Sequence, residues 1–132
     1  MTIQRQNPPG LHPTPGYHHV TIAAPGHTVH LAGQCPLDAE GTVVPGDVLA
    51  QADQVVANTL AALDFAGATP SDVVRTVIYV VTDDRAVLAQ VWDRLTSSAL
   101  GAAFSTASTL LGVAQLGYPG QLIELDVTAA LG

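Results

Sequence analysis

The chain has no lysine and few charged residues of any kind. Charged side chains make up 11% of its 132 residues, and 4 basic residues against 11 acidic ones give a formal net charge of −7. Proteins that bind nucleic acids need clustered Lys and Arg to neutralise phosphate groups. The four basic residues are arginines scattered along the chain: Arg5, Arg75, Arg85 and Arg94. The composition therefore argues against a nucleic acid or an anionic membrane surface as a partner.

Cysteine is nearly absent too, since Cys35 is the only one in the chain. A single cysteine excludes an internal disulfide and is compatible with a reducing compartment. The first twenty residues hold several prolines and no apolar core, which argues against a secretory signal peptide. No apolar run approaches the length that spans a bilayer. We therefore expect a soluble cytoplasmic protein without a membrane partner.

The histidines do not follow a metal-ligand pattern. His18 and His19 are adjacent, so they would face opposite ways on a strand, and His27 and His30 would also face opposite sides of an extended segment. No cysteine pair and no His-Glu-x-x-His helix is present in the sequence. The sequence therefore predicts no metal site.

The shortage of charge goes with an apolar content of 48%. A length of 132 residues predicts one domain, spanning 1–132, with a core of its own. Average proteins have about a quarter of their residues charged, and a less charged surface is expected where subunits cover it. We therefore expect a homo-oligomer; the alternative is a monomer that is simply rich in alanine and valine.

The first half of the chain predicts strands followed by a helix. Residues 1–17 are rich in Pro and Gly and are expected to form an extended lead-in. Residues 18–24 and 28–34 are predicted strands, and the Pro-Gly pair between them favours a hairpin. Residues 38–46 form a predicted loop with a possible short strand at 42–44. Asp47 is the predicted N-cap of a helix with an apolar stripe that ends at Gly67.

The second half predicts alternating strands and a helix. Residues 73–81 are mostly β-branched, which is typical of a central strand. Acidic residues then precede a predicted helix over 85–97, with Trp92 on its apolar side, and residues 100–104 are a predicted loop. The last strands are predicted at 105–114 and 122–130. The order of elements predicts an α+β fold, with two helices packed on one face of a mixed sheet.

The last predicted strand holds the strongest candidate for chemistry. From Leu122 to Ala129 the residues alternate, so that Glu124 and Asp126 share one face and apolar residues share the other. Carboxylates on a rigid, mainly apolar element are often functional. The alternative is that such a carboxylate pairs across a subunit interface.

Seven short segments occur in an order and at a spacing typical of one known family. They are Gly16-Tyr17, Ala32-Gly33-Gln34-Cys35-Pro36-Leu37, the helix segment 51–58, Ala66-Gly67-Ala68 with Asp72-Val73-Val74, Val91-Trp92, Ser108-Thr109-Leu110-Leu111-Gly112-Val113, and Leu122-Ile123-Glu124-Leu125-Asp126. No single segment is decisive, but together they make nearly the whole chain resemble the Rid/YjgF family.

The resemblance implies a fold, an assembly and a reaction. Members of this family adopt a chorismate-mutase-like fold with a mixed six-stranded sheet and form homotrimers with three clefts between neighbouring subunits. Deaminating members hydrolyse enamines and imines of the 2-aminoacrylate type to 2-keto acids and ammonia. They use no metal and no organic cofactor. The resemblance thus implies that this chain is a small-molecule hydrolase of the deaminase type that needs no cofactor.

The resemblance also assigns site residues one by one. In deaminating members a Tyr near the N-terminus, the Gly of a Gly-Gln-x-Pro segment and a Glu of the last strand line the cleft, and these fall on Tyr17, Gly33 and Glu124. The Glu orients or activates the attacking water. An Arg that grips the substrate carboxylate is replaced here by Ser108, with Thr109 beside it, and no nearby Lys or Arg offers an obvious substitute.

The missing guanidinium changes the expected substrate. A guanidinium binds a carboxylate with two parallel charge-assisted hydrogen bonds, whereas serine offers one neutral donor. We therefore expect a neutral or differently held substrate, with Ser108 and Thr109 donating to a carbonyl or amide oxygen. The alternative is a non-catalytic module that binds a small molecule. Ribonuclease, a label sometimes attached to this family, is disfavoured by the acidic, lysine-free composition.

Overall fold

Each of the two predicted helices begins directly after an aspartate that caps its N-terminus. The computed structural model describes residues 2–132, and Met1 lies outside this range. Helix α1 spans Val48–Phe65 and follows Asp47, whose carboxylate accepts a hydrogen bond from the backbone N–H of Ala50. Helix α2 spans Arg85–Thr96, and the carboxylate of Asp84 accepts a hydrogen bond from the N–H of Ala86. These contacts satisfy N–H groups that have no partner within the helix.

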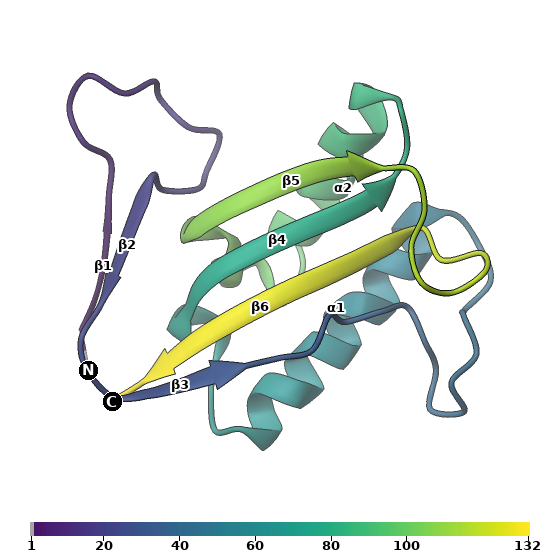
Figure 1. Ribbon diagram of the computed structural model, residues 1–132, viewed down its shortest axis with the longest axis horizontal. Helices are drawn as coiled ribbons and strands as arrows, with labels where there is room; N and C mark the ends of the chain where they lie inside the picture. Colours follow the sequence, from purple (N-terminus) through teal and green to yellow (C-terminus); the bar gives the residue numbers. More distant parts are fainter. Residues whose placement is uncertain (1) are drawn as a thin grey trace.

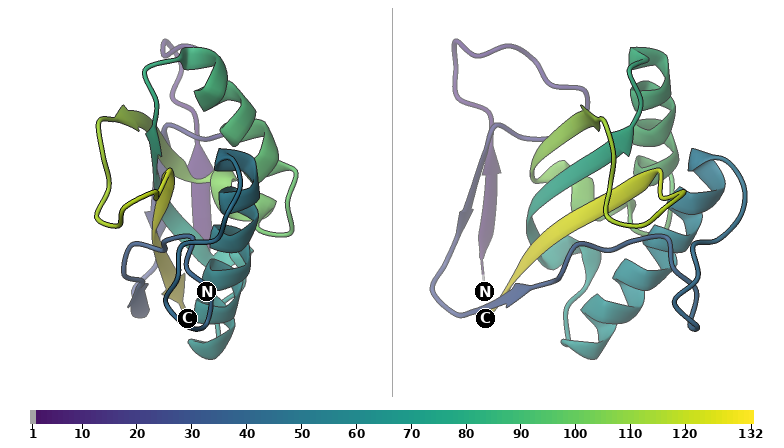
Figure 2. Two further views of the ribbon diagram at one scale, coloured as in Figure 1. Left: turned by 90° about the vertical axis from the view of Figure 1, so that its right-hand side faces the viewer. Right: turned by 45° about the vertical axis from the view of Figure 1, so that its right-hand side comes forward.

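Four strands form a mixed sheet in the order β3-β6-β4-β5 (Figure 1). Their bounds are His27–His30 for β3, Val73–Val81 for β4, Ala107–Val113 for β5 and Ile123–Leu131 for β6. Strand β4 pairs antiparallel with β6 and parallel with β5, so it is central, as predicted. Both helices cover one face of this sheet and leave the other face uncovered (Figure 2). The predicted α+β fold is confirmed.

The N-terminal strands differ from the prediction. Strand β2, Val20–Ala23, pairs with β1, Ile3–Gln6, in a separate two-stranded sheet, while β3 pairs with β6. The predicted hairpin of 18–24 and 28–34 is therefore wrong, and the predicted lead-in contains a strand. Tight hairpin turns need a positive φ, which proline cannot adopt and which Gly26 does not show. Six strands are present, but they divide into sheets of four and two, and β1 takes the place of the possible strand at 42–44 in that number.

The remaining segments are short connections. The predicted strand at 42–44 is reduced to a single bridge between Leu37 and Val43. Three-residue and five-residue 3₁₀ helices, η1 at Pro70–Asp72 and η2 at Gly101–Ser105, precede β4 and β5, and η2 occupies most of the predicted loop 100–104. Within residues 2–132, no helix combines the length and the apolar character needed to cross a membrane.

Strand β6 separates the core from the uncovered face. Its alternate residues Ile123, Leu125, Val127 and Ala129 are at most 1% exposed and pack in the core beneath the helices. Glu124 and Asp126 point to the uncovered face, so the predicted alternation is confirmed. Each buried residue of β6 contributes apolar area to the core, at about 25 cal/mol per Å².

A bulge in β4 places a cation on the uncovered face. The register between β4 and β6 shifts between Val73 and Arg75. In a regular strand these two residues would point to the same side, and Val73 is fully buried. The shift turns Arg75 outward instead, while Thr76, Ile78 and Val80 continue the buried side.

Gln51 connects α1 to the loop that precedes β6. Its side chain is 3% exposed, donates to the carbonyl of Gly120 at 3.0 Å and accepts from the N–H of Leu122 at 2.8 Å. A buried amide with both ends satisfied fixes the distance between the two elements. Gln51 thus sets where β6 begins.

We predict that Gln51→Ala lowers the free energy of unfolding by about 2 kcal/mol, because two buried backbone groups lose their partners. The measurement is urea denaturation followed by circular dichroism. Gln90→Ala is the matched control, because Gln90 is exposed on α2 and should change the value by less than about 0.5 kcal/mol. Equal effects of the two variants would contradict the assigned role of Gln51.

Candidate functional site

The carboxylate of Glu124 is held by two donors on one of its oxygens. The Cys35 thiol donates to Oε1 at 3.3 Å, and the Gln121 amide donates to the same oxygen at 3.2 Å. Glu124 is half-buried on β6, next to Tyr79 of β4 in the register. The side chain is therefore fixed in orientation while one oxygen is left without either of these bonds.

Gly33 lies directly against this carboxylate. A Cβ atom on Gly33 would lie 2.2 Å from Oε2 and 2.9 Å from Cδ of Glu124. Only a residue without a side chain permits the backbone to pass this close. The structure thus brings together Gly33 and Glu124, two of the residues predicted from the sequence.

The segment that carries Gly33 and Cys35 is anchored on both sides. The backbone of Gln34 exchanges hydrogen bonds with Leu125 of β6, at 2.7 and 3.0 Å. On the other side, the amide of Asn58 on α1 donates to the carbonyls of Cys35 and Leu37 at 3.0 and 2.9 Å. The position of the thiol relative to Glu124 is therefore set by both the sheet and the helix.

The environment of Cys35 keeps its thiol protonated. Partial burial, the hydrogen bond to Glu124 and the negative charge of Glu124, in that order, raise the pKa of the thiol from 9.0 to about 11, against a smaller opposing effect of Gln121. A thiolate is the nucleophilic form of cysteine. At neutral pH this cysteine is a hydrogen-bond donor and a poor nucleophile.

A hollow adjoins the Gly33–Cys35 segment. It has a volume of about 480 Å³ and is lined by that segment together with Asn58 and the half-exposed ring of Tyr118. Tyr118 belongs to the loop between β5 and β6. Glu124 is not among the residues that line this hollow.

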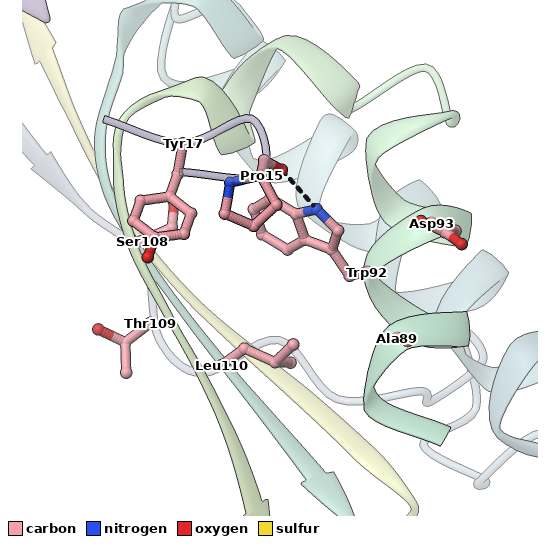
Figure 3. A pocket seen from close by; sticks show the side chains of 8 residues that line it. All are labelled: Pro15, Tyr17, Ala89, Trp92, Asp93, Ser108, Thr109 and Leu110. Atoms are coloured by element: carbon pink, nitrogen blue, oxygen red, sulfur yellow. Dashed lines mark hydrogen bonds between the residues drawn. The ribbon is translucent and has the colours of Figure 1, made fainter. Parts of the chain in front are cut away.

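A second, larger cavity lies at the edge of the sheet, where β5 faces α2 (Figure 3). Its volume is about 620 Å³, and its lining residues are Pro15, Tyr17, Ala89, Trp92, Asp93, Ser108, Thr109 and Leu110. The rings of Tyr17 and Trp92 meet edge to face, and Trp92 Nε1 donates to the carbonyl of Pro15 at 3.1 Å. Trp92, which the sequence analysis placed on the apolar side of the helix, is half-buried and forms a wall of the cavity.

Ser108 and Thr109 point to opposite faces of β5. The hydroxyl of Ser108 lies 2.5 Å from that of buried Thr76 and donates to the carbonyl of Thr106 at 3.0 Å. Thr109 is next to Val77 in the register and faces the uncovered side. The hydroxyl of Ser108 is thus engaged inside the fold.

Arg75 is the residue that the sequence analysis missed. Its Nη2 donates to the hydroxyl of Thr109 at 2.7 Å. A guanidinium therefore lies beside the residue that follows Ser108 in the sequence. No nearby Lys or Arg was expected to offer an obvious substitute for the missing Arg, but Arg75 lies close in the fold. The two residues are far apart in the sequence and meet because β4 and β5 pair in parallel. Among residues 2–132, no carboxylate forms an ion pair with Arg75; the ion pair found there joins Arg94 and Asp53.

One chain does not bring all the predicted residues into one cavity. Tyr17, Ser108 and Thr109 line the cavity at the sheet edge, whereas Gly33 and Glu124 meet elsewhere. Glu124 and Thr109 lie two strands and two residues apart in the register, which is roughly 12 Å at the usual strand spacing and rise. A ligand of a few atoms cannot contact both within a single chain.

The N-terminal histidines have backbone partners. A ring nitrogen of His18 is hydrogen-bonded to the carbonyl of Ser105, and Nε2 of His19 lies 2.8 Å from the carbonyl of His12. Over residues 2–132 there is no group of three or more His, Cys, Asp or Glu side chains arranged to hold a metal ion.

Comparisons with known proteins agree over most of the chain. Residues 9–131 match the family model described as endoribonuclease L-PSP. The chain is 38% identical to the crystal structure of the Rid-family protein YyfB of Yersinia pestis, a protein of unknown function, with a TM-score of 0.87 and coverage of 99% of this chain and 100% of that one. It is 28% identical to the YjgF gene product of E. coli, with a TM-score of 0.63 and coverage of 94% and 92%.

A curated relative matches over a shorter segment. A RutC family protein of Pyrococcus abyssi is 42% identical over 55 residues, which are 41% of this chain and 43% of that protein. The match to the second curated relative covers 42% of its length, so the aligned part of the chain spans about two fifths of the curated relatives.

We predict that Gly33→Ala expels the Glu124 carboxylate from its position, because the new methyl group would overlap Oε2. In an NMR spectrum, the signals of Cys35 and Gln121 should shift while the fold is retained. Gly117→Ala is the control, since a Cβ there meets nothing within 4 Å. Unchanged Cys35 and Gln121 signals in Gly33→Ala would show that the close approach is unimportant.

Proposed function

The chain belongs to the Rid/YjgF family, whose family model is described as endoribonuclease L-PSP, and on this premise we propose that it hydrolyses a small imine, enamine or related carbonyl compound. Membership of this family supports a role in processing or binding a small molecule. The hydrolytic reaction, the cleft and the homotrimer are parts of the proposal. The reaction needs no metal and no organic cofactor.

The observation that carries the proposal is the held but accessible carboxylate of Glu124. Two donors fix Oε1, and the backbone at Gly33 passes against Oε2. A general base must be oriented and must lie within hydrogen-bond reach of the proton that it takes. A carboxylate on a strand that is paired on both sides meets the first requirement better than one on a loop.

A site built by two copies of the chain would resolve the separation of the predicted residues. The uncovered sheet face carries Val77, Tyr79 and the 40% exposed Leu111, which is an apolar surface suited to a subunit contact. Packing of this face against another copy would bring Glu124 of one subunit near the cavity at the sheet edge of its neighbour. We therefore place the cleft between subunits of a homotrimer, as the family resemblance implies.

The proposed reaction is the addition of water to a C=N bond. Glu124 accepts a proton from water as the water oxygen forms a bond to the imine carbon, and the electron pair of the C=N bond moves to nitrogen, which takes up a proton. The O–H proton of the carbinolamine is then transferred to its nitrogen, the C–N bond breaks with its electron pair on nitrogen, and ammonia leaves as the carbonyl forms. A positioned general base contributes about 10² to 10⁴ to the rate of such a step.

Arg75 supports a substrate with a negative charge. Its guanidinium is exposed, and Thr109 is its side-chain partner within residues 2–132. A guanidinium with free N–H groups binds a carboxylate through two parallel bonds. Without such a cation, an anionic substrate would meet only the acidic groups of this face, Glu124 and Asp126.

One observation favours a second function, binding without catalysis. The Ser108 hydroxyl is bonded to Thr76 and Thr106, so it is not available to stabilise a developing oxyanion. A small-molecule sensor would need the cavity at the sheet edge but no activated water. We do not propose RNA cleavage, because the chain has no lysine and a net charge of −7.

We predict that wild-type protein accelerates ketoacid release from enzymatically generated 2-iminobutanoate. Glu124→Gln should lower kcat/KM at least about 100-fold, because an amide cannot accept the proton. Asp126→Asn is the control on the same face of the same strand, and it should retain activity. A Glu124→Gln variant as active as the wild type would refute the proposed mechanism, and one that still binds the substrate without turnover would support it.

We also predict that Arg75→Ala raises KM for 2-iminobutanoate at least about tenfold and leaves KM for a neutral imine unchanged, because only the first carries a carboxylate. Arg85→Ala, at the exposed start of α2, is the matched control. Steady-state kinetics with both substrates provides the measurement. An equal increase in KM for the two substrates would exclude a role for Arg75 in recognising charge.

A further inference from the structure

We propose that Cys35 is a positioning residue, which together with Gln121 holds Oε1 of Glu124 and thereby leaves Oε2 as the oxygen that takes the proton from water. This inference rests on the proposed function, because it assigns the two oxygens of the proposed base to different tasks.

The two donors converge on one oxygen. The Cys35 thiol is 3.3 Å from Oε1, and Nε2 of Gln121 is 3.2 Å from it. Gln121 is itself fixed, because it is 3% exposed, donates also to the carbonyl of Ile123 at 3.0 Å and accepts from the N–H of Tyr118 at 3.2 Å. The amide therefore cannot turn away, and the thiol approaches Oε1 from the segment that follows Gly33.

The other oxygen faces a different environment. Within residues 2–132, no group donates a hydrogen bond to Oε2, and its close neighbour is the backbone at Gly33. The lone pairs of Oε2 remain free to accept a proton. An oxygen that already accepts two hydrogen bonds is a weaker base than one that accepts none, since each bond stabilises the negative charge on it.

The thiol suits this task because it stays protonated. Burial and the neighbouring carboxylate raise the pKa of Cys35 to about 11, so near neutral pH the S–H bond is intact. A thiolate beside Glu124 would instead repel it. The one proton of the thiol has a second acceptor within reach, the carbonyl of Gly33 at 3.6 Å, and the experiments below distinguish the two partners.

The first experiment compares Cys35→Ala with Cys35→Ser in ketoacid release from 2-iminobutanoate. Removal of the donor in Cys35→Ala should lower kcat about tenfold with little change in KM. Cys35→Ser keeps a donor and should recover most of the lost kcat. Because the donor stabilises the charged form of Glu124, Cys35→Ala should also move the acidic limb of the kcat profile to higher pH. Thermal unfolding verifies that both variants fold.

The second experiment needs no substrate for the enzyme. Cys35 is the only cysteine, so the rate of alkylation by iodoacetamide reports on this thiol alone. In Glu124→Gln the charge is lost, and alkylation at pH 8.5 should become at least about threefold faster than in wild type. Asp126→Asn should leave the rate unchanged.

The outcomes separate this inference from the proposed function. A wild-type protein inert toward 2-iminobutanoate would contradict the proposed function for that substrate, and faster alkylation of Glu124→Gln would still support the contact on which the inference depends. Equal alkylation rates in wild type and Glu124→Gln would overturn the inference. So would a Cys35→Ala variant whose kcat and pH profile match those of an active wild type.

Discussion

The pairing of β6 on both sides is the constraint on which the rest of the structure depends. Because β3 and β4 flank this strand, its side chains can only alternate between the helix-covered core and the uncovered face. The apolar set, beginning with Ile123, seals the core, and the same geometry fixes Glu124 on the opposite side. A slip of one residue would bury both carboxylates of the strand and expose its apolar set, so the fold and the orientation of the candidate base cannot be changed separately.

The candidate site residues divide into two kinds. Those that fix the carboxylate are close in the fold and come from short segments: Cys35 and Gly33 from the chain after β3, and Gln121 from the loop before β6. Those suited to contact a ligand lie at the other edge of the sheet, around Trp92 and Thr109. The candidate residues thus lie in two separate regions of the chain, and for this reason the proposed reaction is placed between subunits.

Local signals in the sequence predicted most of the fold. The aspartate caps, the β-branched run of β4 and the alternation of β6 depend on neighbouring residues, so their positions could be predicted. The β1–β2 pairing could not be predicted. The Pro25-Gly26 pair indicates a turn but does not determine whether the strands on its two sides pair with each other, and the four residues of β1 are too few for a clear alternation. Among the site residues, the meeting of Gly33 with Glu124 agrees with the resemblance, but the contact between Arg75 and Thr109 depends on sheet order. The proposed role of Cys35 could not be predicted, because it depends on a contact with Glu124, which is 89 positions away in the sequence.

The bulge at the start of β4 has a consequence for how this surface can diverge. It turns Arg75 outward without altering the buried residues that follow it. Loss of the extra residue, Val74, would restore the regular alternation, with Val73 inward and Arg75 still outward. A deletion further along β4 would instead exchange the buried and exposed side chains of the strand, so the bulge marks the point where β4 can change its length without turning its faces over.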